Sequence, residues 1–420
     1  MKLYNTLTQM VEPFEPRDDQ VGIYVCGITP YDTTHIGHAF TYASVDILIR
    51  YLHLRGLKTI YVQNITDVDD DILRKANQVG EDWRTLGNNW INHYIEDMKD
   101  LNILPPDYFP RASDVIPEMQ DAIKSLLDEK IAYQINGNVY YSINAWPEFG
   151  KLCHLPKSQM LPIANERGNY PDDPCKKDPL DFVLWQSEQP GEPAWESPWG
   201  RGRPGWHIEC STMATKYIGK VVDIHGGGAD LCFPHHEAEI AQVEPVSEKT
   251  PFVRYWFHTS MVEYKGKKMS KSLGNLIMVR DLLEYHSPDA IRIYLGTHHY
   301  RRAWTFDEKD LQKAERLAEK LKNAVTVLDG DGPVLNAESA WAAFVDDMDN
   351  DLNTPSALDK VEGFANEILE AAEAGRNLNE ARKALREFTG VFGLRLEKQD
   401  VEKRVANGWE NYRPKPQENS

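Results

Sequence analysis

Two histidines at the start of a predicted helix are the first residues whose types and spacing suggest chemistry. The segment Thr34–His38 reads THIGH and lies between an apolar run and a stretch of helical periodicity. A helix N-terminus presents unpaired N–H groups and a positive dipole end, which suit a phosphate. His35 and His38 are three residues apart and share a helical face, and Gly37 lets an adenine ring approach the backbone. Ordinary capping or surface histidines explain the segment equally well.

A lysine pair in a glycine-bounded loop is the second such feature. Lys268 and Lys271 lie in the sequence KMSKS, within a loop over residues 266–274 that begins and ends with glycine. Two lysines on a mobile loop could neutralise a leaving pyrophosphate. Taken alone, the segment favours the simpler interpretation of a solvated basic loop.

Four dispersed residues have the chemistry of a metal site. Cys26 ends the first apolar run, Cys210 ends the segment GWHIEC, and His235 and Glu239 are four residues apart. The last two share one face if their segment is helical. Two thiolates, an imidazole and a carboxylate suit Zn²⁺. Dispersed cysteines and histidines are usually core residues, so the residues by themselves favour that alternative.

The elements that must position these residues follow the pattern of an α/β domain. The run 22–26 predicts a buried strand, residues 36–54 carry apolar side chains at helical spacing, and 59–62 predict the next strand. Strand, helix and strand in this order form a βαβ unit, which requires a parallel sheet. Gly56 stands where a helix cap is expected.

The rest of the chain divides by composition. Residues 80–135 have amphipathic helical patterns, whereas 136–205 are rich in Pro, Gly and Trp and predict an irregular insertion. The apolar run 221–225, followed by three glycines, resumes the sheet. We therefore expect three parts: an α/β domain over 1–305, a helical bundle over 306–395 and a disordered tail over 396–420.

The bulk composition bounds the class of protein. The 420 residues are 41% hydrophobic and 27% charged, with a net charge of −18 that disfavours non-specific nucleic-acid binding but permits a local basic patch. No apolar run approaches the ~18 residues of a membrane helix, and the first residues do not form a signal peptide. Five cysteines, an odd and sparse set, predict reduced thiols in the cytoplasm. We expect no membrane partner and favour a monomer.

The THIGH and KMSKS segments occur in this order along the chain and on these predicted elements. Together they resemble the HIGH and KMSKS signatures of the class I aminoacyl-tRNA synthetases. The resemblance implies a Rossmann-like catalytic domain that uses ATP, with Mg²⁺, to form an aminoacyl-adenylate. It implies that the two histidines stabilise the α-phosphate in the transition state and that the lysines act on the leaving pyrophosphate. The implied catalytic residues are His35, His38, Lys268 and Lys271, and the implied ATP contacts are Thr34, Gly37, His38 and Lys271.

The four candidate metal ligands resemble the zinc ligands of the cysteinyl-tRNA synthetases, in which zinc receives the thiolate of the substrate cysteine. They are Cys26, Cys210, His235 and Glu239. Cys26 lies beside the nucleotide motif, so zinc there would lie next to the reacting carboxylate. Zinc favours a soft thiolate over a hydroxyl, so serine should be rejected without a separate editing domain. The implied contacts to the substrate cysteine are Gly27, Thr66, Trp206 and Asp230.

Two features of the sequence indicate different acceptors for the activated cysteine. The tRNA-charging members usually carry a further small C-terminal domain, whereas this sequence continues after Phe392 only as a polar tail. In that respect, and more weakly in segments 81–87 and 166–168, it resembles the cysteine ligase of mycothiol synthesis. Glu239 favours the tRNA-charging branch, because the mycothiol branch has a non-ligating residue at that position.

We therefore expect a cysteine–tRNA ligase that acts on L-cysteine, ATP and tRNA(Cys). Two alternatives stay open. One is a ligase that joins activated cysteine to a glucosaminyl-inositol amine. The other is a catalytically silent, zinc-binding paralogue, which the intact signature motifs disfavour.

Other residues leave a chemical and an ordinary interpretation open. The acidic run 67–71 could hold Mg²⁺ or begin a helix. Cys153, His154 and Cys175 could form a second metal site, although a coincidence within loops is favoured, and Cys232 is assigned to packing. Arg301 and Arg302 could contact phosphates of a tRNA acceptor stem or could be a solvated pair.

Overall fold

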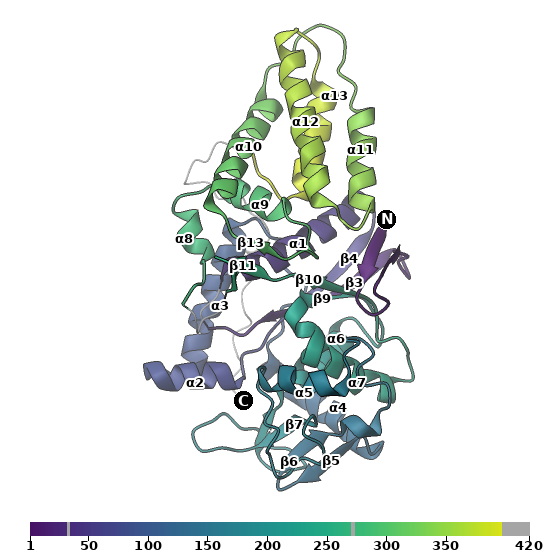
Figure 1. The fold of residues 1–420 in the computed structure, drawn as a ribbon, viewed down its shortest axis with the longest axis vertical. Helices are drawn as coiled ribbons and strands as arrows, with labels where there is room; N and C mark the ends of the chain where they lie inside the picture. Colours follow the sequence, from purple (N-terminus) through teal and green to yellow (C-terminus); the bar gives the residue numbers. More distant parts are fainter. Residues whose placement is uncertain (32–33, 270–273, 397–420) are drawn as a thin grey trace.

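The structure is a computed structural model, and it describes residues 1–31, 34–269 and 274–396 of the 420-residue chain. A four-stranded parallel sheet lies at its centre (Figure 1). The predicted βαβ unit is confirmed, because the first two strands pair in parallel with Ile23 opposite Tyr61. The strands in spatial order are β10 (Val253–Thr259), β9 (Val222–Gly228), β3 (Gln20–Ile28) and β4 (Lys58–Ile65).

Alternation along β3 divides the interior into two hydrophobic cores. Ile23 and Val25 belong to the core shared with α1 (Ile36–Leu54), whereas Tyr24 and Cys26 belong to the core on the opposite face of the sheet. Successive side chains of a strand point to opposite faces. Cys26 therefore faces the helices that follow the insertion and not α1.

Helix α1 begins directly after the loop that follows β3. Arg55 caps its C-terminus, and Gly56 adopts the left-handed conformation with φ +81°, as the sequence predicted. Only glycine enters this region without a steric cost. The helix packs on the sheet and on α9 (Pro288–Gly296).

The segment between the two halves of the sheet is more ordered than predicted. An antiparallel sheet in the order β5-β6-β7-β8 occupies much of it, beside α4 and α5 (Figure 1). The expectation of an irregular insertion over 136–205 was wrong in this respect, because strands of three to six residues are too short to produce a recognisable period. The elements from β4 to the second half of the sheet are α2 (Asp70–Val79), α3 (Trp83–Asp100), α4 (Ile116–Asp128), β5 (Ala132–Ile135), β6 (Asn138–Tyr141), α5 (Lys157–Asn165), β7 (Phe182–Ser187), β8 (Gly202–Pro204), α6 (Trp206–Tyr217) and α7 (Glu237–Ser247).

Small elements frame the parallel sheet. A hairpin of β1 and β2 contacts β10, and a three-stranded sheet in the order β12-β11-β13 contacts α1 through β11. Their bounds are β1 (Lys2–Asn5), β2 (Met10–Pro13), β11 (Val262–Tyr264), β12 (Lys267–Lys268), α8 (Val279–Leu283) and β13 (Trp304–Thr305).

Four long helices form a separate layer, drawn at the top of Figure 1. They pack into the same core as α1 and α9, so the helical domain is continuous with one face of the catalytic domain. The predicted fold class, an α/β domain followed by an α-helical domain, is confirmed. The helices are α10 (Glu308–Thr326), α11 (Glu338–Asp349), α12 (Thr354–Glu373) and α13 (Asn379–Val391).

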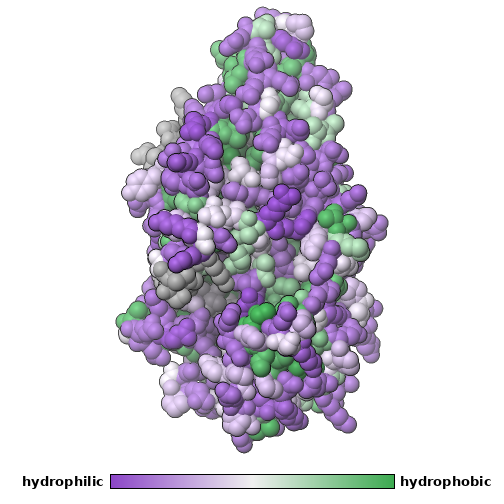
Figure 2. All heavy atoms as spheres, in the orientation of Figure 1, coloured by the Kyte–Doolittle hydropathy of each residue, from purple (hydrophilic) through white to green (hydrophobic). Residues whose placement is uncertain are grey.

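The visible surface is mainly hydrophilic, with apolar residues in scattered groups (Figure 2). Within the described residues, no helix combines the length and the apolar character that a membrane span requires. Of the predicted tail over 396–420, residues 397–420 lie outside the described residues.

Candidate nucleotide and metal sites

His35 occupies the N-cap position of α1. Its Nδ1 accepts hydrogen bonds from the backbone N–H groups of Gly37 (3.1 Å) and His38 (3.4 Å). A neutral imidazole that accepts at Nδ1 carries its proton on Nε2, which is the donor that a phosphate oxygen needs. The His35 and His38 rings stack with centroids 3.8 Å apart. A Cβ at Gly37 would lie 2.9 Å from the His35 ring, so this arrangement requires the glycine.

The chain that leaves the KMSKS loop lies against the HIGH motif. The Ile36 N–H donates to the Ile277 carbonyl (2.8 Å), and the Val279 N–H donates to the Thr34 carbonyl (3.0 Å). These bonds place the two motifs, more than 200 residues apart in the sequence, on adjacent segments. The Lys268 backbone ends β12, opposite Glu263, and Lys271 lies outside the described residues. Thr34 is fully buried, and its predicted contact with ATP stays a prediction.

The four predicted metal ligands meet at one point. Their ligand atoms all lie within 4.8 Å of one another. Cys26 Sγ is 3.7 Å from Cys210 Sγ and 3.6 Å from Glu239 Oε1, and His235 Nε2 is 3.3 Å from Glu239 Oε1. Tetrahedral ligands at zinc bond lengths are about 3.3–3.8 Å apart. The group therefore has the spacing of a four-coordinate metal site.

Three elements supply this group. Cys26 comes from the carboxyl-terminal end of β3, Cys210 from α6, and Glu239 from the first turn of α7. His235 lies just before α7 in the segment Cys232–His236, where Phe233 has extended backbone angles (φ −139°, ψ 133°), and its Nε2 still reaches Glu239. All four side chains are buried, at 6% exposure or less.

The electrostatics of the group favour a cation. Burial raises the pKa of the Cys26 thiol well above its usual value, and the nearby Cys210 and Glu239 raise it further. Burial also lowers the pKa of His235 well below its usual range, helped by His207 and His225, so that imidazole is neutral and able to act as a ligand. A divalent cation among buried acidic ligands would reverse the cost of ionising them.

Further histidines surround the group, and the sequence analysis missed them. His225 Nε2 lies 2.9 Å from Glu239 Oε2, His207 Nδ1 lies 3.0 Å from His235 Nδ1, and His236 Nε2 lies 3.2 Å from Cys26 Sγ. A second combination of Cys26, His225, His236 and Glu239 is also compact enough to hold a metal. The doubled histidine in the segment PHHEAE was the available signal for His236.

Two of the four predicted contacts to substrate adjoin the metal group, Gly27 next to Cys26 and Trp206 against His235, whereas Asp230 lines the cavity described below. The Trp206 ring stacks on His235 at 4.3 Å. The Gly27 N–H donates to Asn64 Oδ1 (2.8 Å), and a Cβ at Gly27 would meet the Asn64 carbonyl oxygen at 1.6 Å. Asn64 also donates from Nδ2 to the Thr66 hydroxyl (3.2 Å). The backbone therefore comes close at Gly27, and Thr66 is held in the same network.

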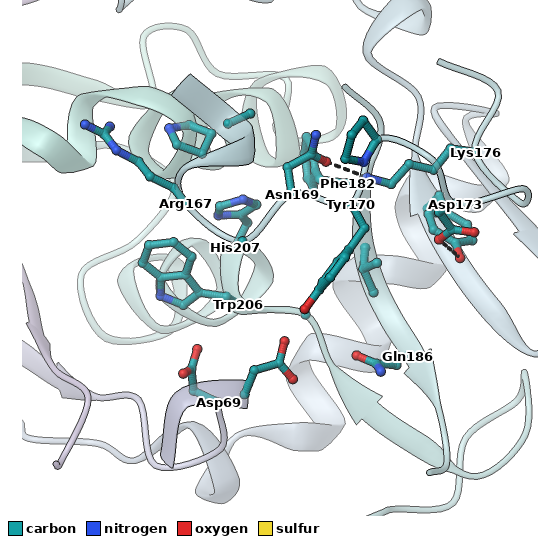
Figure 3. A pocket seen from close by; sticks show the side chains of 18 of the residues that line it. Asp69, Arg167, Asn169, Tyr170, Asp173, Lys176, Phe182, Gln186, Trp206 and His207 are labelled. Carbon is teal, nitrogen blue, oxygen red and sulfur yellow. Dashed lines mark hydrogen bonds between the residues drawn. The ribbon is translucent and has the colours of Figure 1, made fainter. Parts of the chain in front are cut away.

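A large cavity with both polar and apolar lining residues begins beside Trp206 and extends into the insertion (Figure 3). Its volume is about 1200 Å³. Arg167 is one of its lining residues and donates to the carbonyls of Asp230 and Phe233, which also line it. Burial raises the pKa of Asp69, which also lines the cavity, to about 6. The four metal-type residues do not line the cavity, but Trp206 and His207 line it and contact His235. Sequence reasoning did not identify this cavity.

The remaining candidates mostly have ordinary partners. Asp69 caps α2 by accepting from the Asp71 N–H (2.7 Å), and Asp67 accepts from the backbone and hydroxyl of Ser113, so the acidic run begins a helix. Arg301 pairs with Asp351 (2.7 Å).

The other cysteines do not form a second metal site among the described residues. Burial, with a smaller contribution from Glu237, raises the pKa of both Cys153 and Cys232 to about 12. Cys175 accepts a hydrogen bond from Asn136 (3.6 Å).

Solved structures of class I aminoacyl-tRNA synthetases share this fold. The methionyl-tRNA synthetase of Mycobacterium tuberculosis matches 89% of each chain with a TM-score of 0.61 at 15% identity. A leucyl-tRNA synthetase complex from Agrobacterium radiobacter matches 91% of this chain and 85% of its own, with a TM-score of 0.63 at 11% identity. The architecture is therefore that of a class I synthetase.

Sequence comparison gives a narrower assignment. This chain belongs to the family of tRNA synthetases class I (C) catalytic domain, which matches residues 13–316, and a DALR domain matches 343–397. A cysteine–tRNA ligase of Dehalococcoides mccartyi is 42% identical over 94% of this chain and 87% of its own length. The L-cysteine:1D-myo-inositol 2-amino-2-deoxy-alpha-D-glucopyranoside ligase of Thermomonospora curvata is 43% identical over 89% of each chain. The predicted family resemblance is confirmed.

Proposed function

We propose that this chain is a cysteine–tRNA ligase that activates L-cysteine with ATP in the cytoplasm and transfers it to tRNA(Cys). The observation that carries the proposal is the position of the four-residue metal group at the carboxyl end of β3, next to the helix that opens with the HIGH motif. Open α/β sheets bind ligands at the carboxyl ends of their strands. Relatives named cysteine–tRNA ligase, and five free cysteines suited to a reducing compartment, support it.

One Zn²⁺, held by Cys26, Cys210, His235 and Glu239, would supply a soft Lewis acid for the substrate thiolate. The rest of the chemistry is positioning and charge stabilisation. The substrate carboxylate attacks the α-phosphorus of ATP, a carboxyl–phosphate bond forms, and pyrophosphate leaves with the electrons of the broken P–O bond. His35 and His38 donate to the α-phosphate oxygens, and Lys268 and Lys271 neutralise pyrophosphate with its Mg²⁺.

The second step transfers cysteine from the adenylate to a terminal ribose hydroxyl of tRNA, and AMP leaves. The cavity beside Trp206 supports an acceptor that approaches from the insertion side. Glu239 favours tRNA, since it completes a four-ligand group. An amino-sugar amine is the competing acceptor, given the similarity to the Thermomonospora curvata ligase.

Two assays on the zinc-loaded protein test the proposal in sequence. Cysteine-dependent ATP–pyrophosphate exchange should occur, with serine as a control that gives little exchange. Purified tRNA and glucosaminyl-inositol are then offered as acceptors, and we expect charging of tRNA alone. Absence of exchange from zinc-loaded protein contradicts both enzymatic functions, whereas exchange followed by transfer only to the amino sugar contradicts the choice of tRNA.

A further inference from the structure

Arg167 joins the insertion to the turn between β9 and α7. It stands just after α5, and its Nη1 donates to the backbone carbonyls of Asp230 and Phe233. These carbonyls lie 63 and 66 residues further along the chain. One terminal nitrogen of the guanidinium therefore holds both ends of the stretch 230–233.

Packing supports the same junction. Helix α5 contacts the segment Cys232–His236 directly. Arg167 lines the large cavity, and in the view of Figure 3 it is drawn on the same side as Trp206 and His207. Hydrogen bonds from a charged donor are about twice as strong as those between neutral groups. Arg167 therefore restrains this turn more firmly than a neutral side chain would.

This arrangement leaves the carboxylate of Asp230 available. Arg167 contacts Asp230 through the main-chain carbonyl and not through the carboxylate, which forms no ion pair within the described part of the chain. A Cβ at Gly228 would lie 2.6 Å from Asp230 Oδ1, so the carboxylate lies over the end of β9. Because β9 pairs in parallel with β3, that end lies beside the end of β3, near Cys26. A cationic group close to the metal group therefore has an unpaired carboxylate to bind.

His235, the metal-type residue nearest to this turn, has supports of its own. Its ring stacks on Trp206 at 4.3 Å, and its Nε2 is 3.3 Å from Glu239 Oε1. The backbone of Asp230, by contrast, is held from the insertion by Arg167. Loss of the arginine should therefore disturb Asp230 and spare the metal group.

We propose that Arg167 is a positioning residue for cysteine recognition: by holding the carbonyls of Asp230 and Phe233, it fixes the Asp230 carboxylate where it meets the α-ammonium of a cysteine whose sulfur lies at the metal group. The inference rests on the proposed function, because the ligand is cysteine and Asp230 is its predicted contact. It extends the substrate site into the insertion. Arg167 acts through Asp230 and does not itself touch the substrate.

Calorimetry with two ligands tests this role in the zinc-loaded protein. L-cysteine and 3-mercaptopropionate share the thiol and the carboxylate, but only cysteine has the amine. Arg167→Met keeps an unbranched side chain and removes the hydrogen-bond donors. We expect cysteine to bind on the order of 10-fold more weakly, the loss typical of a hydrogen bond to a charged group. Binding of 3-mercaptopropionate should stay within about twofold of wild type.

Two further variants separate positioning from damage to the fold. Arg167→Lys keeps charged donors and should recover part of the affinity for cysteine. Millimolar guanidinium added to Arg167→Ala should also recover part of it, because the site left by the side chain opens on the cavity. Zinc content and the KM for ATP in the exchange assay should match wild type in every variant.

Arg74→Met is the matched control. Arg74 lines the same cavity and pairs with Asp71, and no hydrogen bond joins it to the stretch 230–233 among the residues that the structure describes. Its removal takes the same charge from the cavity and should leave the affinities for both ligands unchanged. A selective loss of cysteine binding as large as that of Arg167→Met would assign the effect to charge and overturn the positioning role.

Equal weakening of both ligands in Arg167→Met, loss of zinc, unchanged affinity for cysteine, or no recovery with either lysine or guanidinium also overturns it. If Arg167→Met does not fold, Arg167→Lys decides, and it should weaken cysteine binding by a smaller factor with the same selectivity. The proposed function fails differently. In that case the wild-type protein itself shows neither cysteine binding nor cysteine-dependent exchange.

Discussion

At the scale of single residues, the metal group places ionisable side chains inside the protein, with Cys26 and Cys210 in a hydrophobic core and Glu239 fully buried. Cys26, Cys210 and Glu239 are buried acids next to one another, an arrangement that a core of packing residues would not favour. Cysteine and carboxylate ligands at tetrahedral spacing are the chemistry that a cation such as zinc stabilises. A bound cation would therefore stabilise a group of buried acidic side chains that is energetically costly without one.

Glu239→Ala should weaken zinc binding by more than about tenfold, because even residues that merely support metal ligands cost 10–100-fold when removed. Competition with a chelator of known affinity measures the change. Cys175→Ser is the matched control, since Cys175 lies outside the group and should leave zinc affinity unchanged. Unchanged zinc stoichiometry and affinity in Glu239→Ala would remove Glu239 from the ligand set.

His35 combines a structural and a chemical role that two substitutions can separate. Asparagine is a good N-cap residue and alanine is a poor one. His35→Asn and His35→Ala should both reduce the rate of ATP–pyrophosphate exchange, because each removes the imidazole donor. Only His35→Ala should also lower the free energy of unfolding, by about 1 kcal/mol. If His35→Asn keeps the wild-type exchange rate, the ring contributes only as a cap.

At the scale of elements, the pairing of residues 34–36 with residues 277–279 joins the two signature motifs. Val279 is the first residue of α8, and Met278 before it has φ −84° and ψ 141°. Proline is tolerated at the first helical position and requires this extended conformation in the residue that precedes it. A proline at 279 therefore removes the hydrogen bond to Thr34 without breaking α8.

Val279→Pro should slow exchange, because it loosens the segment that leads from the KMSKS loop to the HIGH motif. Val279→Ala is the control: it also loses buried side-chain volume but keeps the N–H. We expect the proline variant to show a lower kcat than the alanine variant at similar thermal stability. Equal kcat in the two variants contradicts a functional role for this pairing.

At the scale of the whole molecule, Arg292 joins the helical domain to the catalytic domain. This fully buried guanidinium pairs with Asp46 of α1 (2.5 Å) and donates to the Phe392 carbonyl just after α13 (2.6 Å). A Cβ at Gly393 would meet the guanidinium at 2.4 Å, and this glycine has φ +69°. One side chain thus fixes the C-terminal end of the helical layer on α1.

Arg292→Met should lower the free energy of unfolding by about 3–5 kcal/mol, because it leaves the buried Asp46 carboxylate without its main partner. Urea denaturation at pH 7 measures the loss. Arg292→Lys is the control: it keeps the charge but not the forked geometry, so an intermediate loss is expected. A loss below about 1 kcal/mol in Arg292→Met would show that Arg50 alone satisfies Asp46.

The same pair predicts a pH dependence. Burial by itself raises the pKa of Asp46, but Arg292 and Arg50 outweigh it and hold that pKa below the ordinary value of 3.8. A carboxyl with a lowered pKa in the folded state contributes stability above its unfolded pKa and loses it as pH falls through the folded value. The stability difference between wild type and Arg292→Met should therefore be constant near neutrality and shrink below about pH 4.

The sequence by itself determined the parallel β-α-β unit and the helical C-terminal layer, because hydrophobic periodicity and the Gly56 cap act over a few residues. The four candidate metal ligands and both signature motifs could also be recognised in the sequence, because their residue types and their spacing are distinctive. The sequence did not identify the short strands of the insertion, because their patterns are too brief to produce a period.

The tertiary structure decided which residues meet. Alternation on β3 turned Cys26 toward α6, and the strand order placed it beside Glu239, which lies 213 residues further along the chain. The same packing buried Glu209 without a partner, paired the exposed Arg301 with Asp351, and opened the cavity beside Trp206. Partner, burial and cavity depend on long-range packing, and no local pattern in the sequence encodes them.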